Sequence, residues 1–164
     1  MIFLDGSLGH VLIERSKKKS AGTWSAQFLL KDSHLISEIY DEYIEAGSDI
    51  ITTNTYSTIP SYLSKAGLEG EMPTLIRRAG ELAKNSALKH EGKIKVAGSI
   101  PPLDESYRPD LVHNLEQSLE VYEVLIKEVK PPHNTACSPN RSVSVSSLNV
   151  VFMMPALPPP IALA

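Results

Sequence analysis

The stretch AGSDIITTNTY, from Ala46 to Tyr56, carries most of the information about the fold. Gly47 is suited to end a helix, because glycine readily adopts the left-handed conformation found just after a last helical turn. The run 49–53 is β-branched and too short for a helix, so it predicts a strand. Asn54 and Thr55 follow at the carboxyl end of that strand. The stretch therefore predicts a helix, a tight turn and a strand in immediate succession.

The same alternation continues on both sides of this stretch. Apolar residues recur at helical spacing before it and in two later segments, whereas two other short apolar runs predict strands. The long connection from Gly6 to about Asp32 predicts a loop, with Trp24 as its packing anchor. The expected strands are 2–4, 49–53 and 94–99, and the expected helices are 33–46, 73–88 and 110–129.

This order of elements predicts a parallel sheet with helical crossovers. Two architectures fit the pattern, an open doubly wound sheet and part of a (β/α)8 barrel, and periodicity does not choose between them. Both place functional residues at the carboxyl ends of the strands. In this chain those ends carry Asp5-Gly6, Asn54-Thr55-Tyr56 and Gly98-Ser99.

Composition narrows the class of protein. The chain has 164 residues, of which 42% are hydrophobic and 21% charged, and its net charge of −3 argues against a nucleic-acid-binding surface. No apolar run has the length of a membrane span, and no signal peptide is evident, so a cytoplasmic protein is expected. The single cysteine, Cys137, excludes an internal disulfide and any metal site built from several cysteines of this chain.

The composition changes abruptly near residue 130. The segment 131–164 has one charged residue, Arg141, no glycine, and many prolines and serines. We therefore expect two units: a barrel-forming domain over 1–130 and an irregular tail over 131–164, disordered apart from a marginal strand within 148–154. A frameshift, a retained intron or a misplaced exon would produce such a change.

Several motifs, in this order, resemble the homocysteine S-methyltransferase family. The most specific is the block 46–56, and the resemblance covers about residues 1–130. That family is a (β/α)8 TIM barrel, so the resemblance implies an incomplete barrel, with its first three βα units followed by the irregular tail. The other motifs are Leu4-Asp5-Gly6, Thr23-Trp24-Ser25-Ala26, Val96-Ala97-Gly98-Ser99-Ile100 and Tyr107-Arg108-Pro109-Asp110.

The resemblance implies a zinc-dependent transfer of a methyl group to homocysteine, giving methionine. The segment 52–56 favours a sulfonium donor, S-methylmethionine or S-adenosylmethionine, over betaine. By resemblance, Asp5 could pair with the homocysteine ammonium, the Gly6 backbone could approach the substrate closely, and Asn54 and Thr55 border the same pocket. The family holds zinc through three cysteines of later strands, and these are absent from this chain; Cys137 matches none of them.

We therefore expect a homocysteine S-methyltransferase-like protein that is truncated and inactive alone, and whose unclosed barrel edge could associate with other chains. One alternative is a non-catalytic binding or regulatory fragment that docks on a full-length homologue. Another is an unrelated α/β enzyme with an open sheet. The latter would need a glycine-rich phosphate loop, and the segment 6–9 is a weak candidate for one.

Overall fold

The computed structural model describes residues 1–17, 22–90, 93–104, 114–129 and 149–152. These residues form an α/β structure in which helices alternate with parallel strands. The strands are β1 (Ile50–Thr52), β2 (Lys95–Ile100) and β3 (Asn149–Phe152). The helices are α1 (Leu8–Ser16), α2 (Ala26–Lys31), α3 (Ser33–Glu45), α4 (Pro60–Leu63), α5 (Met72–Lys89) and α6 (Leu115–Val129), with 3-10 turns at Ser64–Ala66 and Glu69–Glu71.

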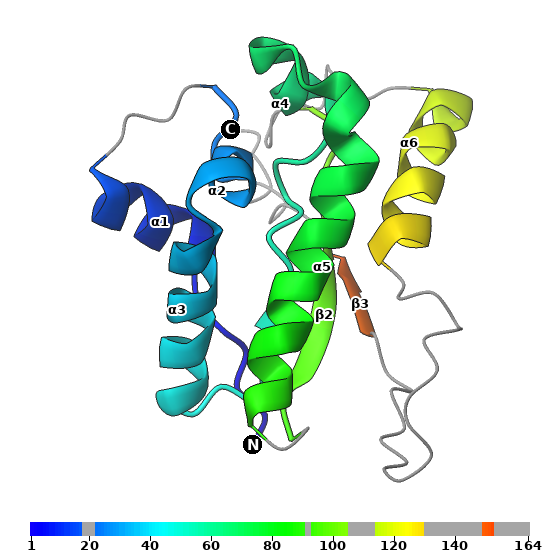
Figure 1. Ribbon diagram of the computed structural model, residues 1–164. Coiled ribbons are helices and arrows are strands. Elements are labelled where there is room, and N and C mark those ends of the chain that lie inside the picture. Colours follow the sequence, from blue (N-terminus) through cyan, green and yellow to red (C-terminus); the bar gives the residue numbers. More distant parts are fainter. Residues whose placement is uncertain (18–21, 91–92, 105–113, 130–148, 153–164) are drawn as a thin grey trace, which may run out of the picture.

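The sheet follows the order of the chain. β1 pairs in parallel with β2, and β2 pairs in parallel with β3. On the other side of β1, Leu4 forms a single parallel bridge with Ile50. Helices α3, α5 and α6 stand beside one another in the same order, on one side of the sheet (Figure 1). The carboxyl ends of the first strands therefore all point the same way.

The core lies between this row of helices and the strands. The apolar stripe expected for 33–46 is buried, with Ile36, Ile39 and Tyr40 almost inaccessible to solvent. The stripe expected for 73–88 is buried as well, including Leu75, Ile76 and Ala79. These two helices match the predictions to within one residue at each end, because each carries a continuous apolar face.

The third expected helix agrees in part. It ends at Val129 as predicted, and Leu125 is its fully buried contact with the core. The expected start near Asp110 lies outside the described residues. The described helix begins at Leu115, where the side chain of Asn114 accepts a hydrogen bond from the backbone N–H of Gln117 (2.9 Å). No helix in the described ranges is both long enough and apolar enough to cross a membrane.

The connection from Gly6 to Asp32 is not simply a loop, and that prediction was wrong. It contains α1 and α2, which pack against α3. Leu8 and Leu12 lie one helical turn apart and are both buried, but two residues are too few for the periodicity to stand out. Trp24 contacts His10 edge-on, with ring centroids 5.3 Å apart, as a packing anchor should.

The expected strand at 2–4 is reduced to the bridge at Leu4, and it is not buried. Ile2, Phe3 and Leu4 keep 70%, 55% and 49% of their surface exposed. Within the described residues this segment pairs with β1 alone, so one of its edges has no strand beside it. Apolar strands of a parallel sheet are buried where other elements cover both of their faces, and these three side chains lack such cover among the described residues.

Four residues of the tail form β3, at the place where the sequence allowed a marginal strand. Val150 and Val151 are β-branched, which suits an extended backbone, and Val151 is in register with Ser99 of β2. The rest of the tail lies outside the described residues.

Candidate functional site

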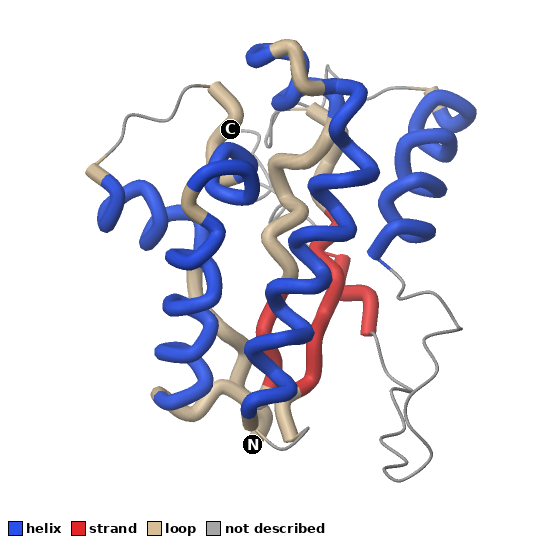
Figure 2. The backbone as a smooth tube through the Cα atoms, in the orientation of Figure 1, coloured by secondary structure: helices blue, strands red, loops and turns tan. Residues whose placement is uncertain are grey.

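The expected site residues lie at the carboxyl ends of the first strands. Asp5 directly follows the bridge at Leu4, while Asn54 and Thr55 follow β1. Figure 2 shows the loop after β1, in tan, continuing away from the strands behind α5. The residues here are polar but mostly buried, so their hydrogen bonds decide what each can do.

Asp5 is held by one residue of β1. Its Oδ2 accepts hydrogen bonds from the backbone N–H of Thr52 (2.8 Å) and from the Thr52 hydroxyl (3.0 Å), and its Oδ1 lies 3.1 Å from the same hydroxyl. The backbone N–H of Asp5 donates to Ile50 (2.9 Å). Asp5 therefore joins the first segment to the end of β1, and its partly exposed carboxylate keeps further acceptor capacity.

Burial and charge shift the pKa values around Asp5. Burial raises the pKa of Asp5 above its ordinary value of 3.8, and the hydrogen bonds from Thr52 oppose that rise. Burial also raises the pKa of Tyr40 and of Tyr43, and the negative charge of Asp5 adds to both shifts. The phenol of Tyr40 donates a hydrogen bond to the backbone carbonyl of Thr52 (2.7 Å). Asp5 thus sits beside two neutral phenols of α3.

Gly6 makes a close approach to one of those phenols. A Cβ added to Gly6 would lie 2.7 Å from the Tyr43 hydroxyl and 2.9 Å from a carbon of its ring. No side chain fits there unless Tyr43 moves. A Cβ on Gly6 would therefore point toward α3. Glycine is needed here because Tyr43 fills the space that a side chain would take.

Asn54 is buried, and both ends of its amide are bound by Ser25. Its Oδ1 accepts a hydrogen bond from the Ser25 hydroxyl (2.7 Å), and its Nδ2 donates to the Ser25 carbonyl (3.2 Å). The hydroxyls of Ser25 and Ser57 are 3.0 Å apart. Asn54 therefore fastens the start of α2 to the end of β1.

Thr55 is fully buried and connects β1 to β2. Its hydroxyl donates to the backbone carbonyl of Ser99 (2.6 Å) and lies 2.9 Å from the hydroxyl of Thr53. The backbone N–H of Ser99 in turn donates to the Thr53 hydroxyl (3.1 Å). This closed set of hydrogen bonds satisfies polar groups that would be costly to leave unpaired inside the protein.

The structure thus divides the four expected residues. Asp5 and Gly6 form one group with Thr52, Tyr40 and Tyr43, and Asn54 and Thr55 belong to the buried hydrogen-bond network. The sequence analysis did not single out Thr52, Tyr40 or Tyr43, although Thr52 lies in the decisive stretch. Ser25 and Ser99, which bind Asn54 and Thr55, both lie in motifs that the sequence analysis quoted. Their presence in those motifs was the signal that could have identified them.

The side chains of this chain do not fit a zinc site. Among the described residues, no group of three or more His, Cys, Asp or Glu side chains could hold a metal ion. The chain has one cysteine, Cys137, which lies outside the described residues. A site made of three thiolates therefore cannot come from this chain alone.

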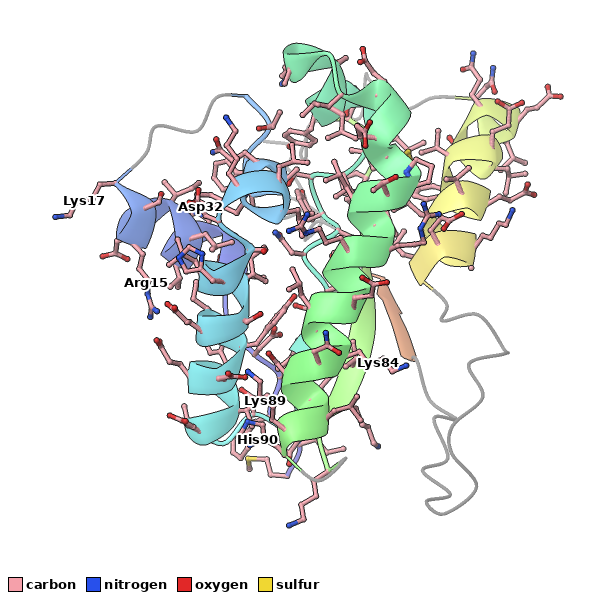
Figure 3. The ribbon with its side chains drawn as sticks, in the orientation of Figure 1. Arg15, Lys17, Asp32, Lys84, Lys89 and His90 are labelled. Atoms are coloured by element: carbon pink, nitrogen blue, oxygen red, sulfur yellow. The ribbon has the colours of Figure 1, made fainter. Side chains whose placement is uncertain are left out.

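A hollow of about 390 Å³ lies at the opposite end of the sheet. Its lining includes Lys89, His90 and Lys93, together with Ile44 and Ile94. Figure 3 shows Lys89 and His90 at the end of α5, near the foot of the view. Lys89 is paired with Asp41 (2.6 Å), so its charge is already used to join α5 to α3. This hollow is separate from the strand ends that carry Asp5 and Asn54.

Comparison with known proteins points to one family. The family model for homocysteine S-methyltransferase matches residues 2–138. Homocysteine S-methyltransferase 1 of Arabidopsis thaliana is 39% identical over 77 residues, which cover 46% of this chain and 24% of that protein. The homocysteine S-methyltransferase of Escherichia coli K12 is 29% identical over 109 residues, which cover 62% of this chain and 35% of that protein.

A solved structure gives the same result in three dimensions. The metallated form of the homocysteine methyltransferase MmuM from Escherichia coli superposes with a TM-score of 0.68 at 27% identity, over 78% of this chain and 49% of that one. The chain thus matches about half of the solved enzyme and a quarter to a third of these curated relatives. Because the family match extends over most of its length, this chain belongs to the homocysteine S-methyltransferase family.

Proposed function

We propose that this chain forms the amino-terminal part of a homocysteine-binding (β/α)8 barrel. The consecutive parallel strand order and the row of helices on one side of the sheet support the proposal, because a barrel has both features. In this proposal residues 1–130 supply the first βα units and residues 131–164 are a separate tail. β3 then occupies the place beside β2 that a fourth strand would take.

The function we infer is binding of homocysteine for methyl transfer from a sulfonium donor, S-methylmethionine or S-adenosylmethionine, in the cytoplasm. The observation that carries it is the Asp5 carboxylate, partly exposed and held in place at the carboxyl end of a family-matched sheet. A carboxylate in that position can pair with the ammonium of an amino acid. The cation would favour the ionised form of Asp5 and so oppose the effect of burial on its pKa.

Transfer requires the homocysteine sulfur to lose its proton and bond to the methyl carbon, while the bond from that carbon to the donor sulfonium breaks. The residues of this chain bind and orient the amino-acid end of the substrate. With one cysteine they do not supply the three-thiolate zinc site expected for the family. We therefore propose that the 164-residue chain alone binds substrate but does not turn it over.

Binding is tested by titrating homocysteine into the purified full chain and measuring heat. We expect saturable binding that Asp5→Asn weakens by about tenfold, the usual effect of losing a charge-assisted hydrogen bond. Glu81→Gln is the matched control, since it removes one negative charge from an exposed position of α5. Equal loss in both variants, or no binding to the unmodified chain, would contradict the proposed role of Asp5.

Inactivity of the chain alone is tested separately. We expect substoichiometric zinc by metal analysis and no methionine from homocysteine with either sulfonium donor. Stoichiometric zinc together with turnover would overturn this part of the proposal.

The exposed apolar segment at 1–4 favours one other function, a binding or regulatory fragment that docks on a full-length homologue. A pull-down with the intact Escherichia coli enzyme tests it. Capture that is lost on changing Phe3 to Lys would support docking through this edge.

A further inference from the structure

Thr52 holds the side chain of Asp5, the candidate substrate contact, and no sequence motif pointed to this role. Its backbone N–H and its hydroxyl both bind the Asp5 carboxylate, at 2.8 to 3.1 Å. Its carbonyl accepts the hydrogen bond of the buried Tyr40 (2.7 Å). One residue at the end of β1 therefore connects the Asp5 carboxylate to helix α3.

The Asp5 side chain depends on this connection, because the other hydrogen bonds of its segment hold the backbone and not the carboxylate. The segment is joined to β1 by the bridge at Leu4, by backbone hydrogen bonds of Phe3 and Asp5, and by the Asp49 carboxylate, which accepts a hydrogen bond from the Phe3 N–H (2.8 Å). None of these contacts involves the Asp5 side chain. Without Thr52, the Asp5 side chain could rotate about its own bonds, and holding it for a ligand would cost rotational entropy. The two contacts to Thr52 remove that freedom before any ligand arrives.

The other groups that face Asp5 do not set the orientation of its carboxylate. From α3, the phenols of Tyr40 and Tyr43 face its charge, and both are neutral at neutral pH, because a phenol titrates near 10 and burial raises the pKa of each further. The Tyr40 hydroxyl is used by Thr52, and the Tyr43 ring packs over Gly6.

We propose that Thr52 is the positioning residue for Asp5, fixing the orientation of its carboxylate toward the ammonium group of an amino-acid substrate. This inference rests on the proposed function for the identity of the substrate. The orientation itself is a property of the free chain, so it can be tested without any substrate.

The first test is the titration of Asp5, followed by the carboxyl carbon signal of its side chain in NMR of the full chain. Thr52→Val keeps the shape and suits a strand but removes the hydroxyl, so we expect the pKa of Asp5 to rise. Thr52→Ser, which keeps the hydroxyl, should restore the value of the unmodified chain. Thr74→Val, at an exposed position of α5, is the matched control and should leave it unchanged.

The second test is homocysteine binding by the same variants. We expect Thr52→Val to weaken binding by about tenfold and Thr52→Ser to recover most of it. An unchanged Asp5 titration in Thr52→Val would overturn the positioning role. If the unmodified chain binds no homocysteine, the proposed function fails, and the titration alone decides whether Thr52 orients Asp5.

Discussion

Asp5 and the pair Asn54 and Thr55 lie at the same end of the sheet but are held in opposite ways. Asp5 is partly exposed and is fixed by one neighbouring residue, with acceptor capacity to spare. Asn54 and Thr55 are buried, and their polar groups are satisfied within the chain. Residues at one end of a sheet can therefore divide into side chains that keep free acceptor capacity and side chains whose hydrogen bonds are all used within the chain.

The largest effect on stability should come from removing the hydrogen bonds of Asn54. Asn54→Ala removes both hydrogen bonds to Ser25 and leaves a buried hydroxyl and carbonyl short of partners, so we expect a loss of about 3 kcal/mol in unfolding free energy. Urea denaturation of the full chain measures it. Asn85→Ala, on an exposed face of α5, should cost nothing. Similar stability of the two variants would mean that Asn54 is not structural.

Thr55→Val should have the next largest effect. The change keeps the shape but removes the bond to the Ser99 carbonyl and leaves the Thr53 hydroxyl with one partner fewer. We expect a loss of about 2 kcal/mol by urea denaturation, with Thr74→Val near zero. A loss of homocysteine binding at unchanged stability would instead place Thr55 on the substrate side of the comparison.

Gly6→Ala should cost less, about 1 kcal/mol, because the new methyl group can be accommodated if Tyr43 shifts. The Tyr43 ring signals in NMR should move with it. In a Tyr43→Ala background the same change should cost almost nothing, since the clash has been removed. Equal costs in both backgrounds would show that the strain lies elsewhere.

The smallest effect, and the only one of these that depends on pH, belongs to Asp5. Burial raises its pKa, so the folded chain binds this proton more tightly than the unfolded chain, whose value is near 3.8. The contribution of Asp5 to stability is therefore complete below 3.8 and is lost as pH rises through the folded pKa. The unfolding free energy of the unmodified chain minus that of Asp5→Asn should fall over this interval.

If this difference rose with pH instead, the Thr52 hydrogen bonds would outweigh burial in setting the pKa of Asp5. The comparison with Asp5→Asn is needed because Glu42 acts in the other direction. Its pairing with Arg15 lowers its pKa, so the stability it contributes is lost as pH falls. Asn54 and Thr55 do not titrate, so neither adds a pH dependence of its own.

The sequence predicted the long helices well because their apolar stripes are continuous over several turns. α1 and α2 were missed because each is short and buries only a few side chains. Asp5 and Asn54 were placed at the correct end of the sheet by strand order alone. Their different burial could not be read from the sequence, since it depends on Ser25, Tyr40 and Tyr43, which reach the strand ends from other elements.

The pairing at the single Leu4 bridge affects how fast backbone amides near Asp5 exchange, compared with those near Asn54 and Thr55. Backbone groups in segments with few buried contacts exchange their amide hydrogens through small local openings, whereas those in a packed core exchange only when larger units open. The amides of Asp5 and Ile50 bond across that bridge, but those of Thr53 and Ser99 are enclosed between β1 and β2. The amides at the Leu4 bridge should thus exchange with solvent deuterium earlier than those of Thr53 and Ser99.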